Sequence, residues 1–138
     1  MTKTRVLFLC TGNSCRSQMA EGWLRQLAGD RFEALSAGIE AHGKNPRAIA
    51  IMREAGVDIS GQESEIIDPE LLKTIDLLVT VCSHADAHCP AVYIPGKREH
   101  WPFNDPARTI GSEEEVMNEF RRVRDQIKAR IEVFTNEG

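Results

Sequence analysis

Short apolar runs alternate along this chain with longer segments in which apolar residues recur every three or four positions. Three runs, at 5–10, 32–37 and 75–82, are short and rich in apolar residues, which predicts strands. A shorter run at 92–94 predicts a fourth strand. The stretch from 96 to 111 contains two prolines and no clear period, so we expect an irregular loop there.

Four segments between and after these runs are expected to be helical. The first begins at about Arg16 and ends near Gly29. The second and third each begin with an N-cap residue followed by proline, at Asn45-Pro46 and Asp68-Pro69. The last begins with a capping box at 112–115 and continues with apolar residues along one face.

Strands that alternate with helices predict a parallel sheet built from right-handed crossovers. The expected fold is a single α/β domain over residues 1–138, with a four-stranded parallel sheet and helices on both faces. Ligands of such sheets bind beyond the carboxyl ends of the strands. Cys10 and Cys82 are both predicted at such ends, which makes them candidates for chemistry.

The composition narrows the class of protein. The 138 residues are 41% hydrophobic and 28% charged, as in globular proteins generally, and the length fits one domain. The net charge of -4 makes general affinity for nucleic acid unexpected. No apolar run is long enough to span a membrane, and the first residues do not resemble a secretion signal. We therefore expect a cytoplasmic protein without a membrane partner.

Residues 10–17 have the composition of an oxyanion-binding loop between a strand and a helix. Backbone N–H groups of a tight loop, together with the positive end of a helix, form a site for a tetrahedral anion. Arg16 could hold two anion oxygens, and the same positive field should favour the thiolate of Cys10, the nucleophilic form. Ser17 could donate a hydrogen bond to that thiolate. The anion-binding residues would be Thr11, Gly12, Asn13, Ser14, Cys15, Arg16 and Ser17.

Two less specific interpretations of this loop stay open. Cys10 could be a buried thiol at the end of a strand, followed by an incidental arginine. The strand–turn–helix context favours the anion site instead, because context is what confirms such a motif. Cys15 is expected to be a packing thiol within the loop.

The loop also resembles a known family. Residues 10–21 (Cys-Thr-Gly-Asn-Ser-Cys-Arg-Ser-Gln-Met-Ala-Glu) are similar to the signature loop of the low-molecular-weight protein tyrosine phosphatases, and more narrowly to that of the thioredoxin-coupled arsenate reductases. Further similarity covers most of the chain. It lies in Ser36-Ala-Gly38, Val79-Thr-Val-Cys82, Cys89-Pro90, His100-Trp101 and Asp105-Pro106.

The resemblance implies an arsenate reductase with a relay of three thiols. Reducing arsenate to arsenite takes two electrons, which two thiols supply by forming a disulfide, and a third thiol could move that disulfide by exchange. The resemblance assigns these roles to Cys10, Cys82 and Cys89, with thioredoxin as electron donor. Arsenate would be the substrate, phosphate or sulfate would be analogues, and the protein is expected to be a monomer without a tightly bound cofactor.

The spacing of the second and third thiols constrains such a relay. If 83–88 is helical, the Cα atoms of Cys82 and Cys89 lie about 10 Å apart, whereas a disulfide needs less than about 7 Å. Oxidation should therefore unwind this segment. Two other readings remain: a metal site that includes His84 and His88, and a pair of buried structural thiols.

Asp105 is the candidate general acid. Pro106 restricts Asp105 to an extended conformation, which could present its carboxyl group to a leaving oxygen. Taken alone, Asp-Pro more often begins a turn or helix; the resemblance favours catalysis. A phosphatase that hydrolyses aryl phosphates through Cys10 is the alternative function. The residues at 107–109 weaken it, because that family has aromatic side chains there.

Two lesser features complete the analysis. Some relatives bind potassium beside the loop, and the matching candidate ligands are Asn13, Glu21, Ser36 and Glu65, where aspartate is usual at the last position. These groups could equally serve as hydrogen-bond partners within loops. The basic stretch at 121–130 is interpreted as a solvated helix face.

Overall fold

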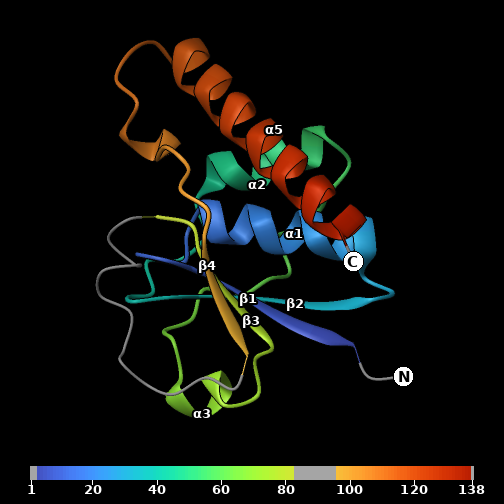
Figure 1. Cartoon of the computed structure of the whole chain (residues 1–138). Helices are drawn as coiled ribbons and strands as arrows, with labels where there is room; N and C mark the ends of the chain where they lie inside the picture. The colour runs from blue at the N-terminus through green and yellow to red at the C-terminus, as the bar shows by residue number, and fades with distance from the viewer. Residues whose placement is uncertain (1–2, 83–95, 138) are drawn as a thin grey trace.

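A computed structural model describes residues 3–82 and 96–137 of the chain (Figure 1). Four strands form one parallel sheet, as the sequence predicts, and their order across the sheet is β2-β1-β3-β4. The strands are β1 (Thr4–Cys10), β2 (Phe32–Gly38), β3 (Leu77–Thr80) and β4 (Lys97–His100).

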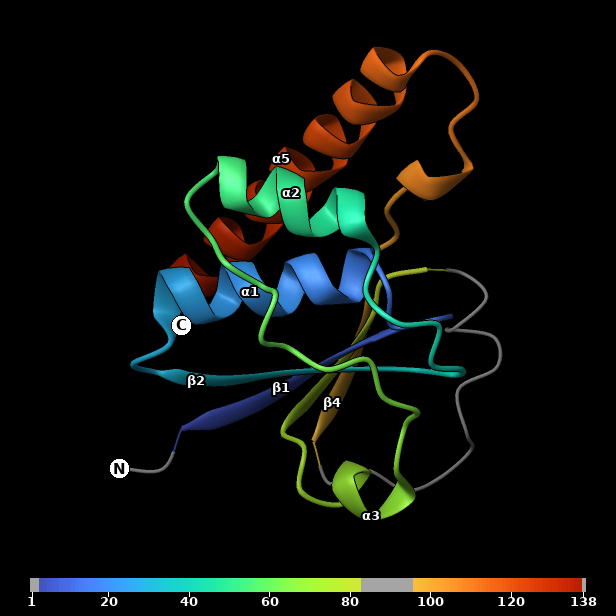
Figure 2. The ribbon, with the colours of Figure 1, turned by 180° about the vertical axis from the view of Figure 1, so that it is seen from behind.

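Helices cover both faces of this sheet, which confirms the predicted fold class. The larger layer packs on one face and contains α1 (Arg16–Ala28), α2 (Pro46–Glu54) and α5 (Glu113–Glu137). The short helix α3 (Pro69–Leu72) lies on the opposite face, as the two views of the ribbon show (Figures 1 and 2). Within the part of the chain that the structure describes, no helix combines the length and apolar character needed to cross a membrane.

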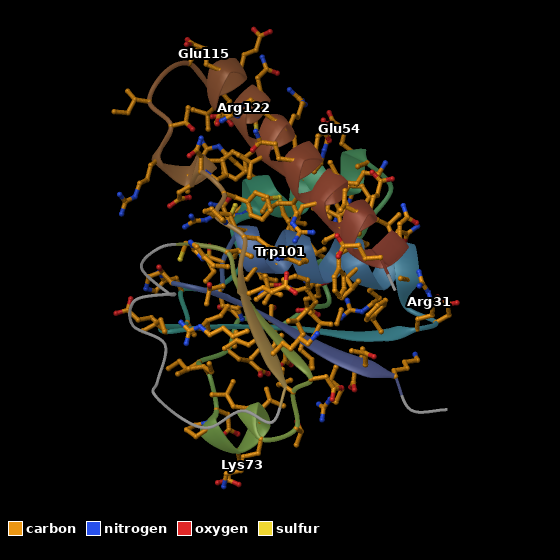
Figure 3. The ribbon with its side chains drawn as sticks, viewed as in Figure 1. Arg31, Glu54, Lys73, Trp101, Glu115 and Arg122 are labelled. Carbon is orange, nitrogen blue, oxygen red and sulfur yellow. The ribbon has the colours of Figure 1, made fainter. Side chains whose placement is uncertain are left out.

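The core forms between the sheet and the larger helical layer. Residues 6–10 of β1 are buried because β1 lies inside the sheet, with β2 on one side and β3 on the other. Trp101 lies within the fold, between the sheet and α5, whereas the labelled charged side chains point outward (Figure 3). Its ring packs against Phe8 of β1 and Phe134 of α5, with centroids 5.9 and 5.5 Å apart.

The predicted helix starts are confirmed by their capping bonds. The Asn45 side chain accepts hydrogen bonds from the N–H groups of residues 47 and 48. The Asp68 side chain accepts one from residue 70. Ser112 and Glu115 bond reciprocally through their side chains and N–H groups, at 3.1 and 3.2 Å, as a capping box requires. The expected inner face of α5 is buried at Phe120, Val123, Ile127 and Ile131.

The prediction of an irregular loop over 96–111 is wrong in two places. Residues 97–100 form the strand β4, and Pro106–Arg108 forms a 3₁₀ turn, η1. The sequence Lys-Arg-Glu-His hides this strand, because a charged edge strand shows neither an apolar run nor alternation. Its place comes from backbone pairing with β3. The strand expected at 92–94 lies outside the described residues.

Candidate active site

Cys10 and Cys82 meet at the carboxyl edge of the sheet. Cys10 is the last residue of β1, and Cys82 follows its neighbour β3, whose ladder continues through a Val81 N–H bond to Leu9. The two thiol side chains hydrogen-bond to each other, and both are buried. The sulfur of Cys82 also lies 3.3 Å from the Thr11 hydroxyl oxygen. Two buried thiol side chains that influence each other's ionisation are thus brought together where the sequence predicts a ligand site.

The loop after Cys10 is held in shape from its outer side. Its carbonyl groups at Cys10, Thr11, Gly12 and Ser14 accept hydrogen bonds of 2.8–3.1 Å from four N–H groups in one segment, residues 39–45. In a trans peptide the N–H points away from the C=O. The N–H groups of these peptides therefore turn away from 39–45, which is the arrangement that an anion-binding nest requires.

Gly38 is needed where β2 meets this loop. A Cβ atom at position 38 would lie only 2.7 Å from the backbone nitrogen of Asn13 and 2.9 Å from the Thr11 carbonyl oxygen. Any side chain there would push the loop outward. The glycine therefore lets β2 and the segment that follows it approach the anion loop closely.

The start of α1 completes the cradle. The helix begins at Arg16, and its N-cap residue Cys15 makes no capping bond through its side chain. The N–H groups of the first turn and the positive end of the helix dipole therefore serve the loop, as the sequence predicts.

Asn13 and Ser17 anchor the loop from behind. Asn13 has a φ of 47° and is fully buried. The Ser17 hydroxyl donates to the Asn13 side-chain oxygen at 2.9 Å, and Gln18 donates to the Asn13 carbonyl at 3.0 Å. The expected bond from Ser17 to Cys10 is therefore wrong, because a hydroxyl has a single hydrogen and this one is directed to Asn13.

Arg16 spans the pocket toward the segment before η1. One terminal nitrogen donates to the Phe103 carbonyl at 3.0 Å, and the other lies 3.6 Å from a carboxylate oxygen of Asp105. Its Nε is buried and has no hydrogen-bond partner among residues 3–82 and 96–137. A guanidinium that is only partly satisfied in this way is suited to receive anion oxygens.

Asp105 adopts the extended conformation predicted for a residue before proline, with φ -84° and ψ 104°. One carboxylate oxygen accepts the Ala107 N–H at 3.0 Å and caps η1, so the helix-start interpretation also holds. The other oxygen faces Arg16 and lies 3.7 Å from Nε of Arg108. Asp105 thus reaches the pocket while its backbone is fixed by a turn.

The expected thiolate at Cys10 is not favoured in this arrangement. The hydrogen bond with Cys82 and burial both raise the pKa of the Cys10 thiol, and the negative charge of Cys82 raises it further. Arg16 and the Thr11 N–H act in the opposite direction and are outweighed. The positive field of the loop favours the thiolate, as the sequence predicts, but the second thiol and the burial of Cys10 together outweigh it.

Cys15 behaves as the packing thiol that the sequence predicts. Burial raises its pKa to about 12, and the charge of Asp105 adds to the shift while Arg16 opposes it. Its thiol is therefore protonated at neutral pH, and only its backbone is suited to anion binding.

One pocket of about 1030 Å³ joins these groups. The anion loop forms one wall, and residues 102–108 form the other. Cys82 and His42 also line it. His42 has no signal in the sequence beyond its place shortly after β2, and sequence reasoning missed it.

The candidate potassium ligands come together in a second region, but they do not fit a cation. Ser36 donates to one carboxylate oxygen of Glu21 at 2.5 Å, and Arg25 binds the other. The Asn13 side-chain oxygen already accepts from Ser17. The pKa of Glu65 is raised, mainly by a hydrogen bond with Glu63 and to a lesser extent by burial, and this favours the protonated carboxyl group of Glu65. The guanidinium of Arg25 supplies the positive charge at Glu21 that a metal ion would bring.

Three predicted site residues lie outside the described part of the chain. They are Cys89 and the two histidines of the alternative metal site, His84 and His88. Within 3–82 and 96–137 no group of three or more His, Cys, Asp or Glu residues is placed to bind a metal ion.

Comparison with known proteins identifies the family. The family model described as low molecular weight phosphotyrosine protein phosphatase matches residues 5–137. The chain belongs to this family. It is 55% identical over 138 residues to an arsenate reductase of Bacillus licheniformis, and the match covers 100% of this chain and 99% of that protein.

Solved structures of this phosphatase family's fold are also similar. A structure described as an arsenate reductase in the phosphate binding state is 36% identical, with a TM-score of 0.76 over 97% of this chain and 98% of that one. A Corynebacterium glutamicum thioredoxin-dependent arsenate reductase is 26% identical, with a TM-score of 0.68 over 95% of this chain and 63% of that one.

Proposed function

We propose that this protein reduces arsenate to arsenite, with Cys10 as nucleophile and Cys82 as the second electron-donating thiol. The observation that carries the proposal is that Cys82 lies beside both Cys10 and the oxyanion loop that Cys10 begins. Hydrolysis of a phosphate ester needs one nucleophile, whereas a two-electron reduction needs a second thiol close to the first. The similarity to curated arsenate reductases supports the same activity.

The first step forms a bond between sulfur and arsenic. Arsenate binds to the loop N–H groups and Arg16, and the Cys10 thiolate attacks arsenic. Asp105 delivers a proton to the departing oxygen, which leaves as water. Because Cys82 raises the pKa of Cys10, the two thiols carry one negative charge far more readily than two. Bond formation to arsenic removes the charge on Cys10, and Cys82 can then ionise in its turn.

The second step transfers the electrons. The Cys82 thiolate attacks the sulfur of Cys10, a Cys10–Cys82 disulfide forms, and the sulfur–arsenic bond breaks with its electron pair on arsenic. Arsenite leaves, arsenic has gained two electrons, and the two thiols have lost two. The interaction of the two thiols in the structure supports this step, because it places the second thiol next to the first.

The relay then returns the enzyme to its starting state. Cys89 attacks Cys82, which frees Cys10 and leaves a Cys82–Cys89 disulfide for a dithiol protein to reduce. We propose thioredoxin as that protein. The thioredoxin dependence of the Corynebacterium relative supports this choice.

A coupled assay tests the function directly. Wild-type protein with arsenate, thioredoxin, thioredoxin reductase and NADPH should oxidise NADPH in proportion to the arsenite formed. The kcat/KM for an aryl phosphate should be at least ~100-fold lower than that for arsenate. Efficient hydrolysis of the aryl phosphate without NADPH oxidation would instead establish the alternative, a phosphatase that acts through Cys10.

Potassium is not expected to be required. Replacing potassium chloride by choline chloride at equal ionic strength should leave kcat/KM for arsenate within about twofold, because Ser36 and Arg25 already bind the Glu21 carboxylate. Initial rates over a potassium titration provide the measurement. A saturable activation by potassium that sodium does not reproduce would contradict the expectation.

A further inference from the structure

His42 stands against the anion loop from the segment that follows β2. A methyl group on the α-carbon of Gly12 would lie 2.4 Å from Nδ1 of His42 and 2.8 Å from its Cγ. The imidazole therefore occupies the space beside Gly12 that a side chain would fill. It also lines the pocket that contains Cys10 and Arg16. The side chain is 55% exposed, so an incoming ion can reach it.

Glu40 fixes the orientation of this ring. Its carboxylate lies 2.6 Å from Nε2 of His42. A carboxylate only accepts hydrogen bonds, so Nε2 carries a hydrogen and the other ring nitrogen, Nδ1, is the one nearest Gly12. The backbones of both residues are also held, because their N–H groups donate to the carbonyls of Thr11 and Gly12 at 2.8 and 2.9 Å. The ring is therefore ordered before any ligand arrives.

We propose that His42 is a further substrate-binding residue whose Nδ1 hydrogen-bonds an oxygen of the bound oxyanion, with Glu40 as the residue that positions it. This inference rests on the proposed function. Arsenate near neutral pH offers both a hydroxyl group and charged oxygens. A neutral imidazole accepts a bond from the hydroxyl, and a protonated one donates to a charged oxygen.

His42 and Arg16 contact the pocket from different parts of the loop. Arg16 is largely buried and shares its guanidinium between the Phe103 carbonyl and Asp105. His42 contacts the loop at Gly12, four residues before Arg16. The ring would give an oxygen of the bound anion one more hydrogen-bond partner without touching the reacting sulfur, so His42 should improve binding more than it accelerates the chemical step.

Side-chain variants that keep every backbone N–H isolate this role. His42→Ala removes the ring, His42→Asn restores a short donor and acceptor, and Glu40→Gln weakens the fixation of the ring. Ala41→Ser is the matched control, since it alters an exposed neighbour between the two residues. The measurements are the Kd for inorganic phosphate by calorimetry, KM and kcat for arsenate, and Tm.

The expected result is a loss of affinity with little change in turnover. His42→Ala should raise the phosphate Kd and the arsenate KM about five- to tenfold, with kcat and Tm close to wild type. His42→Asn should recover part of that loss, Glu40→Gln should lose less than His42→Ala, and Ala41→Ser should match wild type.

Two outcomes would overturn the inference. One is a His42→Ala protein with unchanged Kd and KM. The other is an equal loss of affinity in His42→Ala and His42→Asn that comes with a lower Tm. That result would show that the ring only packs against Gly12. The phosphate titration separates this inference from the proposed function: wild-type protein that binds phosphate without reducing arsenate would refute the activity, and the variants would still report on His42.

Discussion

Replacing Cys82 by serine should abolish arsenite formation, whereas replacing Cys89 by serine should permit one turnover. In the Cys82→Ser protein the sulfur–arsenic bond can form, but the thiol that the proposal assigns to attack Cys10 is missing. The expected loss of steady-state turnover is at least ~1000-fold, since covalent catalysis by a missing nucleophile cannot be replaced by a hydroxyl.

The two serine variants differ in a way that identifies the order of the relay. After one reaction with arsenate, the Cys89→Ser protein should have released one equivalent of arsenite and should contain a disulfide between Cys10 and Cys82. Quenched single-turnover reactions with arsenite quantification, followed by mass spectrometry of alkylated peptides, measure both. Arsenite release at the wild-type rate from Cys82→Ser would refute the electron transfer proposed here.

A serine introduced into the core away from the pocket controls for the polar substitution. Ala28 at the end of α1 is buried and lies far along the helix from the anion loop. Ala28→Ser should retain turnover close to wild type. Loss of activity in this variant as well would point to instability of the fold, and circular dichroism of all three proteins distinguishes that case.

Arg16→Lys should lower kcat/KM for arsenate by roughly 100- to 1000-fold, the range found when one donor to a developing oxyanion is removed. The charge is retained, but an ammonium group cannot present two parallel N–H donors to two oxygens. In the structure two different nitrogens of the guanidinium reach Phe103 and Asp105. The single ammonium nitrogen of lysine cannot make both contacts. Binding of inorganic phosphate should weaken in parallel.

Arg122→Lys is the matched control for Arg16→Lys. Arg122 pairs with Glu119 one turn earlier on the exposed face of α5, so the same substitution there should leave kcat/KM and phosphate binding unchanged. A decrease of less than threefold in Arg16→Lys would show that a point charge suffices, and the bidentate role of Arg16 would be wrong.

The sequence predicts the main architecture because the decisive signals are local. Proline after an N-cap residue marks the start of α2 and of α3, and apolar periodicity marks the inner face of α5. The edge strand β4 has no such signal, since this segment is held in a strand conformation by backbone pairing with β3. Sequence patterns report what a segment buries, and an exposed edge strand buries little.

The candidate site also has parts that the sequence reveals and parts that it does not. The loop from Cys10 to Arg16 is visible in the sequence because its parts are adjacent along the chain. The position of His42 against Gly12 depends on residues that meet only after β2 has paired with β1. The largest cause of the raised Cys10 pKa is likewise distant, since it is Cys82, which is 72 residues away.

The hydrogen bonds from residues 39–45 to the loop have a further consequence. They join main-chain groups alone, so the curvature of the cradle does not depend on which side chains occupy that segment. Side chains there can diverge during evolution while the capacity to hold a tetrahedral ion persists. Selection can therefore change which reaction follows capture of the ion without rebuilding the receptor, and one inherited cradle can serve both hydrolysis and reduction.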